Sequence, residues 1–265
     1  MNRNSVNLIR QFLLVAAISL SGQSAVFGAE FYKNCVQHFG GAICKIRISG
    51  PIVTGDAASL RALLRMPEHK DAYETGILEL DSPGGDVYEA LKIVALMKEW
   101  IGTASVEGNA ECASACFIIW IGSPMHAQSR VGSNAGKIGL HRPYFDKLTY
   151  RKDDVEKIAR NQSEVMLTMR KFLEGENLSQ RLIDEMMRRA SNDIYWLTNE
   201  DFEEIGVHSP YLEEMSIQYC GNTLKGTNQL LTSLPVSEYN LAKLKFLKCV
   251  DDMAKKRRPP VLRSN

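Results

Sequence analysis

Three short segments of the chain carry residue types that suit serine-based acyl transfer. A lone serine, Ser114, lies among small residues and precedes an apolar run at residues 117–121. Residues 82–86 read Ser-Pro-Gly-Gly-Asp, and His141 follows in Leu-His-Arg-Pro. Serine attacks a carbonyl only when a base takes its proton and donors hold the developing oxyanion. The three segments therefore predict a nucleophile, a place for the oxyanion and a base.

Exposed main-chain NH groups are the predicted oxyanion donors. Gly84 and Gly85 follow Pro83 without side chains that would block approach, and glycine tolerates the dihedral angles of such a bend. We expect the NH groups of Gly85 and Ala115 to be the donors, with Ser114 at the positive end of a helix. An ordinary tight turn is the alternative interpretation of Pro-Gly-Gly.

His141 is the predicted base, because an imidazole can take a proton from serine and return it. A third group must hold the imidazole tautomer, and Asp193 is the predicted one. It follows a helical stretch and precedes an aromatic segment. Asp184 and Asp201 are the alternatives.

Alternating strands and helices are expected to position these residues. The pattern predicts strands at residues 45–49, 77–80, 103–106 and 137–140, a helix that Asp56 can cap, a second helix after the glycine bend, and a buried helix at 114–121. This order indicates an α/β domain with mostly parallel pairing, whose active sites lie at the carboxyl ends of strands.

Longer helices are expected at residues 153–174 and 179–190, followed by a short helix that starts at the capping residue Thr198 and ends at Gly206. We expect a domain at 29–219 and a helical appendage at 220–265 with a disordered basic tail. Residues 1–28 have the order of a secretory signal peptide: basic residues, a short apolar core and small residues. The expected location is therefore periplasmic or secreted. An uncleaved N-terminal anchor, with the domain still on the far side of the membrane, is the alternative.

Six cysteines follow that segment, an even count that suggests disulfides in an exported chain. Pairing between sequence neighbours predicts Cys35 with Cys44, Cys112 with Cys116, and Cys220 with Cys249. The pair around Ser114 would clamp the nucleophile turn; two buried free thiols are the alternative. No spacing typical of zinc ligands accompanies the cysteines, so no metal or other cofactor is expected. The formal net charge of +1 leaves no electrostatic footprint for nucleic acid.

Taken together, Ser-Pro-Gly-Gly, Ala-Ser before an apolar helix, and Ile-Gly-Leu-His-Arg-Pro resemble the Clp protease proteolytic subunit (ClpP) and the wider crotonase-type superfamily. The resemblance covers about residues 45–207. It implies a ClpP/crotonase-like spiral of β-β-α units with a long helical handle at residues 153–190, and a homo-oligomer. It also implies a serine endopeptidase with nucleophile Ser114, base His141, orienting acid Asp193, and an oxyanion hole from Gly85 and Ala115.

Several features depart from that family. Asp81 stands where the family commonly has Asn, and the signal peptide, the Cys35–Cys44 segment and the chain after Cys220 have no counterpart. These departures favour an exported bacterial peptidase acting on peptides or proteins. No ATPase partner is expected, because ATP is scarce outside the cytoplasm.

Three other functions compete with that prediction. The first is a catalytically inactive binding or assembly protein of the same fold. The second is a Ser-Lys dyad enzyme that uses Lys137 or Lys157. The third is a crotonase-type acyl-CoA enzyme, which the exported location disfavours because CoA thioesters are cytosolic.

Overall fold

The computed structural model describes residues 28–38, 41–65, 77–100, 102–128, 135–144, 155–190 and 192–221, with five single positions between 245 and 253. Its strands are β1 Glu30–His38, β2 Gly41–Ser49, β3 Ile77–Asp81, β4 Thr103–Val106, β5 Glu111–Ala113, β6 Met125–Gln128, β7 Lys137–Leu140 and β8 Tyr195–Trp196. Its helices are α1 Asp56–Arg65, α2 Val87–Trp100, α3 Ala115–Gly122, α5 Val155–Gly175, α6 Gln180–Arg188, α7 Asn199–Ile205 and α8 Pro210–Cys220.

Two sheets organise these elements. The larger has the order β1-β2-β3-β4-β6 and is parallel except for the antiparallel β1–β2 pair. The smaller has the order β5-β7-β8, with β5 parallel and β8 antiparallel to β7. The predicted α/β class with mostly parallel pairing is confirmed.

The strands at 103–106 and 137–140 have the predicted bounds, whereas five elements were not predicted: β1, β5, β6, β8 and α8. Each lacks a periodic apolar signal. The strand β5 has only three residues, β6 reads Met-His-Ala-Gln, and β1 contains charged or polar residues at most positions. Pairing with neighbours, rather than their own composition, places these strands in the sheets.

The helix α3 is buried along its whole length, as its uniformly apolar sequence predicts. It packs in the main core with α2 and with strands of both sheets. At its end, a Cβ on Gly122 would lie 2.7 Å from Phe172 of α5 and 2.8 Å from Val94 of α2. Glycine therefore ends α3 where two other helices close over it.

One capping prediction is wrong. The carboxylate of Asp56 accepts hydrogen bonds from the NH groups of Val53 and Ala29, at 2.8 and 3.3 Å, and does not cap the α1 helix. The first turn of α1 is instead satisfied by Glu89 of α2, which accepts from Gly55 and Ala57. A buried carboxylate on a neighbouring helix reached these donors, and sequence periodicity carries no signal for it.

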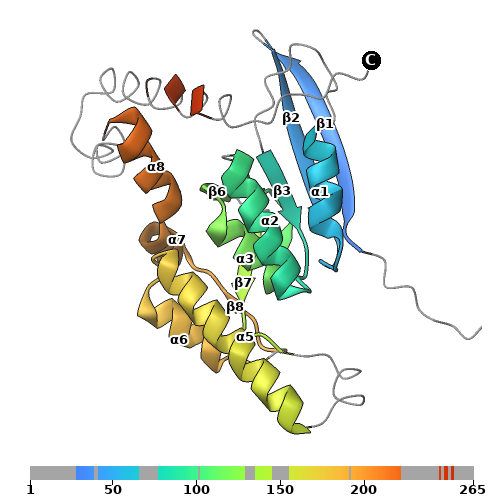
Figure 1. Cartoon of the computed structure of the whole chain (residues 1–265), viewed down its shortest axis with the longest axis vertical. Coiled ribbons are helices and arrows are strands. Elements are labelled where there is room, and N and C mark those ends of the chain that lie inside the picture. The colour runs from blue at the N-terminus through green and yellow to red at the C-terminus, as the bar shows by residue number, and fades with distance from the viewer. Residues whose placement is uncertain are drawn as a thin grey trace, which may run out of the picture.

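The helices α5 and α6 lie side by side and extend toward the lower end of the molecule in Figure 1, away from β1 and β2. Both predicted helices are present with shifted ends, and the side chain of Ser179 caps α6. An ion pair of 2.5 Å between Lys98 and the buried Glu176 joins α2 to the end of α5. Burial raises the pKa of Glu176, although Lys98 opposes this shift.

The predicted capping box of α7 is present, with Thr198 as N-cap and Gly206 as C-cap. The structure contains disulfides between Cys35 and Cys44, Cys112 and Cys116, and Cys220 and Cys249. Most of the predicted signal peptide and of the C-terminal appendage lies outside the described residues. Among the described helices, none combines the length and apolar character needed to span a membrane.

Candidate active site

The turn after β3 lies against the turn after β5. The NH of Ser82 donates to the carbonyl of Glu111 at 2.7 Å, and the NH of Ala113 donates to the carbonyl of Ser82 at 3.0 Å. Asp81, at the end of β3, bonds to Arg47 and accepts the NH of Glu111. These main-chain bonds hold the Ser-Pro-Gly-Gly turn against the strand that leads into Ser114.

The strand β7 brings His141 to the same edge. In the parallel β5–β7 pair, Ala113 is opposite Gly139, and the NH of Ser114 donates to the Gly139 carbonyl at 3.1 Å. Paired strands lie about 4.8 Å apart. Ser114 and His141 therefore leave adjacent strands at neighbouring levels, as predicted for the carboxyl end of a parallel pair.

Ser114 has an unusual backbone conformation for a residue with a side chain, with φ of 58° and ψ of −122°. Such conformations cost about 1–3 kcal/mol and gather at functional sites. Ser114 is the N-cap of α3, yet its side chain makes no capping hydrogen bond. The hydroxyl is therefore not committed to its own helix, which leaves it available for chemistry at the positive end of α3.

Gly84 lies in close contact with the nucleophile turn. Its φ is 97°, and an added Cβ would come within 2.6 Å of the Ser114 Cβ and 2.8 Å of the Ala115 nitrogen. Only glycine fits there. The sequence predicted a bend at this position but not this contact, which makes Gly84 the residue that seats one turn on the other.

The two predicted oxyanion donors flank that contact. Ala115 is the first residue of α3, where an NH has no intrahelical acceptor. Gly85 forms a bridge with Ile52, but that bridge uses the NH of Ile52 and the NH of Asp86. The NH of Gly85 takes no part in it and is therefore not occupied by the strand pairing.

His141 is buried, with 5% of its surface exposed, and its Nδ1 lies 2.9 Å from the carbonyl oxygen of Arg142. A carbonyl oxygen only accepts, so Nδ1 is the donor in this hydrogen bond, and in the neutral imidazole Nε2 is then the acceptor. That tautomer is the one a general base needs. The main-chain carbonyl is a contact that the sequence could not indicate.

Asp193 precedes the first residue of β8 by two positions. The strand β8 runs antiparallel to β7 with Tyr195 opposite Leu140, so residues before Tyr195 lie beside residues after Leu140. The side chain of Asp193 is 55% exposed, and both its oxygens accept from Arg189, at 2.9 and 3.0 Å. Among the hydrogen bonds of the described residues, none joins Asp193 to His141.

The two alternative carboxylates have other partners. Asp184 is 61% exposed and bonds to Arg170 and Gln180. Asp201 is buried and accepts from Arg181, from the Tyr195 hydroxyl at 2.9 Å and from the Thr198 NH at 2.8 Å.

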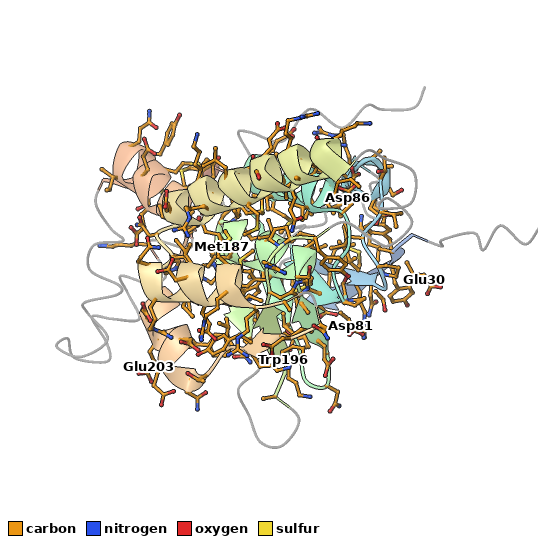
Figure 2. The ribbon with its side chains drawn as sticks, turned by 90° about the horizontal axis from the view of Figure 1, so that it is seen from below. Glu30, Asp81, Asp86, Met187, Trp196 and Glu203 are labelled. Atoms are coloured by element: carbon orange, nitrogen blue, oxygen red, sulfur yellow. A yellow bond between two sulfur atoms is a disulfide. The ribbon has the colours of Figure 1, made fainter. Side chains whose placement is uncertain are left out.

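Burial disfavours the charged form of Asp201, but its hydrogen bonds to Thr198, Arg181 and Tyr195 outweigh burial and lower its pKa. This network links α6 and α7 to β8, the strand beside β7. Figure 2 labels Trp196 on β8, the strand that this network supports, and Asp81 at the end of β3. Asp201 is therefore committed to supporting the sheet that carries His141.

The lysines proposed for a dyad lie at exposed positions. Lys137, at the start of β7, pairs with Glu111 at 3.0 Å and lies over the Trp196 ring, whereas His141 follows the other end of that strand. Lys157 lies on an exposed part of α5. Within the described part of the chain, no three His, Cys, Asp or Glu side chains cluster as metal ligands would.

The fold and the sequence together define the class. The sequence profile of the Clp protease family matches residues 41–209. This stretch contains both sheets except β1, and all three turns of the candidate site. The fold is therefore a ClpP/crotonase-like α/β fold. The chain belongs to the Clp protease family, a family of peptidases.

Among solved structures, the chain is similar to a membrane-bound stomatin-specific protease, 1510-N, with 18% identity and a TM-score of 0.41. The match covers 63% of this chain and 76% of that one. It is also similar to ClpP1 from Listeria monocytogenes, with 18% identity and a TM-score of 0.40, over 61% and 86% of the two chains. Among curated proteins, no significant sequence match was found.

Proposed function

We propose that this protein is an exported serine endopeptidase that cleaves peptides or proteins without an ATPase partner. The observation that carries the proposal is that three turns, those that follow β3, β5 and β7, lie together. Gly84 lies against Ser114, and the NH of Ser114 donates to the carbonyl of Gly139, two residues before His141. A single tight turn or a single buried histidine would not need this convergence.

In the proposed reaction, the Ser114 hydroxyl attacks the substrate carbonyl while Nε2 of His141 takes its proton. The bond from Nδ1 to the Arg142 carbonyl holds the imidazole in the required tautomer. The protonated His141 then donates to the leaving amine, and the acyl group remains on Ser114. Water, activated by the same nitrogen, releases the acyl group and restores the serine.

The oxyanion of each tetrahedral intermediate would lie between the NH groups of Gly85 and Ala115. Both groups come from main chain whose positions are fixed by strand pairing or by the start of α3. Donors that are held before the reaction need no reorganisation as charge develops, and one such donor is typically worth about 100- to 1000-fold in rate.

Asp193 is the proposed orienting acid. Its location beside the end of β7 supports this role. To act, its carboxylate would exchange Arg189 for His141, and Nδ1 would exchange the Arg142 carbonyl for the carboxylate. Substrate binding or assembly of subunits would have to supply the energy for this exchange.

Export is proposed from two observations. Residues 1–28 have the pattern of a signal peptide, and the structure contains three disulfides. Disulfides persist mainly in oxidising compartments such as the bacterial periplasm. We further propose a homo-oligomer that associates through α5 and α6, where Leu167 is 54% exposed.

A second candidate is a catalytically inactive binding protein of the same fold. The ion pair between Arg189 and Asp193 favours it, because that pair occupies the proposed orienting acid.

Labelling with a fluorophosphonate probe separates the two functions. Oxidised wild-type protein should be labelled at Ser114 and hydrolyse an unfolded protein substrate, and both signals should vanish in Ser114→Ala and His141→Ala. Ser163→Ala, on the exposed face of α5, is the matched control and should behave as wild type. Equal hydrolysis by wild type and Ser114→Ala, or absence of labelling in folded wild type, would overturn the peptidase proposal.

A further inference from the structure

The disulfide between Cys112 and Cys116 spans the nucleophile turn. Cys112 is in β5, Cys116 is in the first turn of α3, and Ser114 lies midway between them. Their Cα atoms are 5.2 Å apart, and neither cysteine has exposed surface. The bond therefore lies beneath the turn, on the side away from solvent.

Each end of this bond is attached to a different part of the site. Cys112 is opposite Ile138 in the β5–β7 pair and forms a bridge with Ser82. Cys116 belongs to the helix whose first NH, at Ala115, is a proposed oxyanion donor. The disulfide thus ties the helix start to the strand that sets the positions of the other two turns.

Besides the packing of Gly84 against it, the conformation of Ser114 has few other restraints. Its φ is positive, which is unfavourable for a residue with a Cβ, and its side chain makes no capping bond that would hold the start of α3. The main-chain bond to Gly139 restrains the NH of Ser114 but not the peptide that follows it. Gly84 packs against that peptide, and the disulfide adds a covalent link across the turn.

We infer that the Cys112–Cys116 disulfide is a positioning element, which holds Ser114 and the NH of Ala115 in the geometry that acyl transfer requires. The inference rests on the proposed peptidase function and extends it. Without the bond, the turn keeps its place in the core but loses its fixed orientation. The chemical step should then suffer while substrate binding is retained.

The first experiment compares two double variants. Cys112→Ala/Cys116→Ala should lower kcat by about 100-fold, with KM within about threefold, because a small misplacement of a reacting group has an effect of that size. Cys35→Ala/Cys44→Ala is the matched control: it removes a disulfide between paired residues of β1 and β2 and should leave kcat within about twofold. Equal kcat values for the two variants would overturn the inference.

The second experiment keeps every atom of the turn. In a variant with the other four cysteines changed to alanine, dithiothreitol can reduce only Cys112–Cys116. Two electrons and two protons pass to the sulfurs to form two thiols, and dithiothreitol closes to its cyclic disulfide. Activity and the fluorophosphonate labelling rate should fall together and recover on reoxidation, while circular dichroism stays unchanged. Full activity with two free thiols would overturn the inference even if the double variant fails to fold.

Failure of the peptidase proposal has a different signature. In that case oxidised wild-type protein is neither labelled nor active. If only the positioning role is wrong, wild type is active and reduction leaves kcat unchanged.

Discussion

The nucleophile turn and the segment that carries Asp193 flank β7 on its two sides, and they are held in different ways. On the β5 side, Ser114 is seated by main-chain bonds, a close glycine contact and a buried disulfide. On the β8 side, Asp193 and Asp201 are held by arginine side chains that are partly exposed. The first arrangement is fixed by packing, whereas the second depends on charges that water and other side chains can replace.

The difference indicates where the site can change. A turn held by main-chain bonds, close packing and a disulfide has one geometry, so substitutions there should abolish function rather than tune it. An exposed ion pair such as Arg189–Asp193 is worth about 0–1 kcal/mol, so a modest interaction is enough to rearrange it. In the proposed mechanism, the nucleophile is therefore preorganised, and the orienting acid is the adjustable partner.

Gly84→Ala should break the nucleophile side most severely. An added Cβ would collide with Ser114 and with the Ala113 carbonyl at 2.6 Å, so the two turns must separate. We expect a loss of about 1000-fold in kcat/KM, from displaced oxyanion donors and a displaced nucleophile.

Gly55→Ala is the matched control for backbone strain. Gly55 also has a positive φ, 107°, but its Cβ would meet nothing within 4 Å. This variant should lose stability by about 1–2 kcal/mol in urea unfolding and keep its activity. Equal activity losses in both variants would show that strain, not the contact with Ser114, is responsible.

Asp193→Asn tests the β8 side. The expected effect is about 100-fold on kcat, less than in enzymes with a preformed triad, because the Arg142 carbonyl already holds the required tautomer. Asp184→Asn removes a comparable exposed carboxylate that also pairs with arginine and should change kcat by less than about twofold. Full activity in Asp193→Asn would remove this residue from the mechanism.

Asp201→Asn should affect stability rather than chemistry. Loss of its ionic hydrogen bonds should lower the free energy of unfolding by about 2 kcal/mol at pH 7. Because the folded-state pKa of Asp201 is lowered, its contribution is present above the unfolded pKa near 3.8 and is lost as pH falls through the folded value. Urea unfolding from pH 7 to 2.5 should show less acid destabilisation in the variant than in wild type. Glu203→Gln, exposed on the same helix, should leave that profile unchanged.

The core around α3 should lose stability in acid, and His126→Phe should reveal this loss. His126 lies against Trp120 of α3 with ring centres 4.6 Å apart, and burial lowers its pKa to about 4 from 6.5. Its contribution is complete above pH 6.5 and is lost as pH falls toward 4. Wild type should lose about 1.4 kcal/mol between pH 8 and 5.5 from this residue. Unfolding curves for the Phe variant should lack that component; an unchanged slope would contradict the assignment.

Much of the β5 side could be predicted from residue types because local rules determine it. A wholly apolar segment after Ser114 requires a buried helix, and a Pro-Gly-Gly bend between a strand and a helix requires exposed NH groups. The contact of Gly84 with Ser114 could not be predicted, since it depends on how β3 and β5 register across the two sheets.

The β8 side was harder to predict from the sequence, for a physical reason. Asp184 lies within α6, Asp193 in the segment that follows α6, and Asp201 in the first turn of α7, and at each position a carboxylate can have a purely structural role. Only the antiparallel pairing of a two-residue strand puts the segment that carries Asp193 beside the residues that follow Leu140, and so short a strand has no periodic signal. The role of Asp201 in holding Arg181 and Tyr195 depends on tertiary contacts that no spacing rule contains.

The complete burial of α3 has a consequence for how the chain reaches its native state. Residues 115–122 contain no charged side chain. When the unfolded chain exposes them, their β-branched and aromatic groups are typical of segments that aggregate. Any unfolded chain presents this segment to its neighbours until the core closes over it. Refolding yield should therefore fall steeply as protein concentration rises. The segment that follows Ser114, the proposed nucleophile, is also the one that makes slow or crowded folding hazardous.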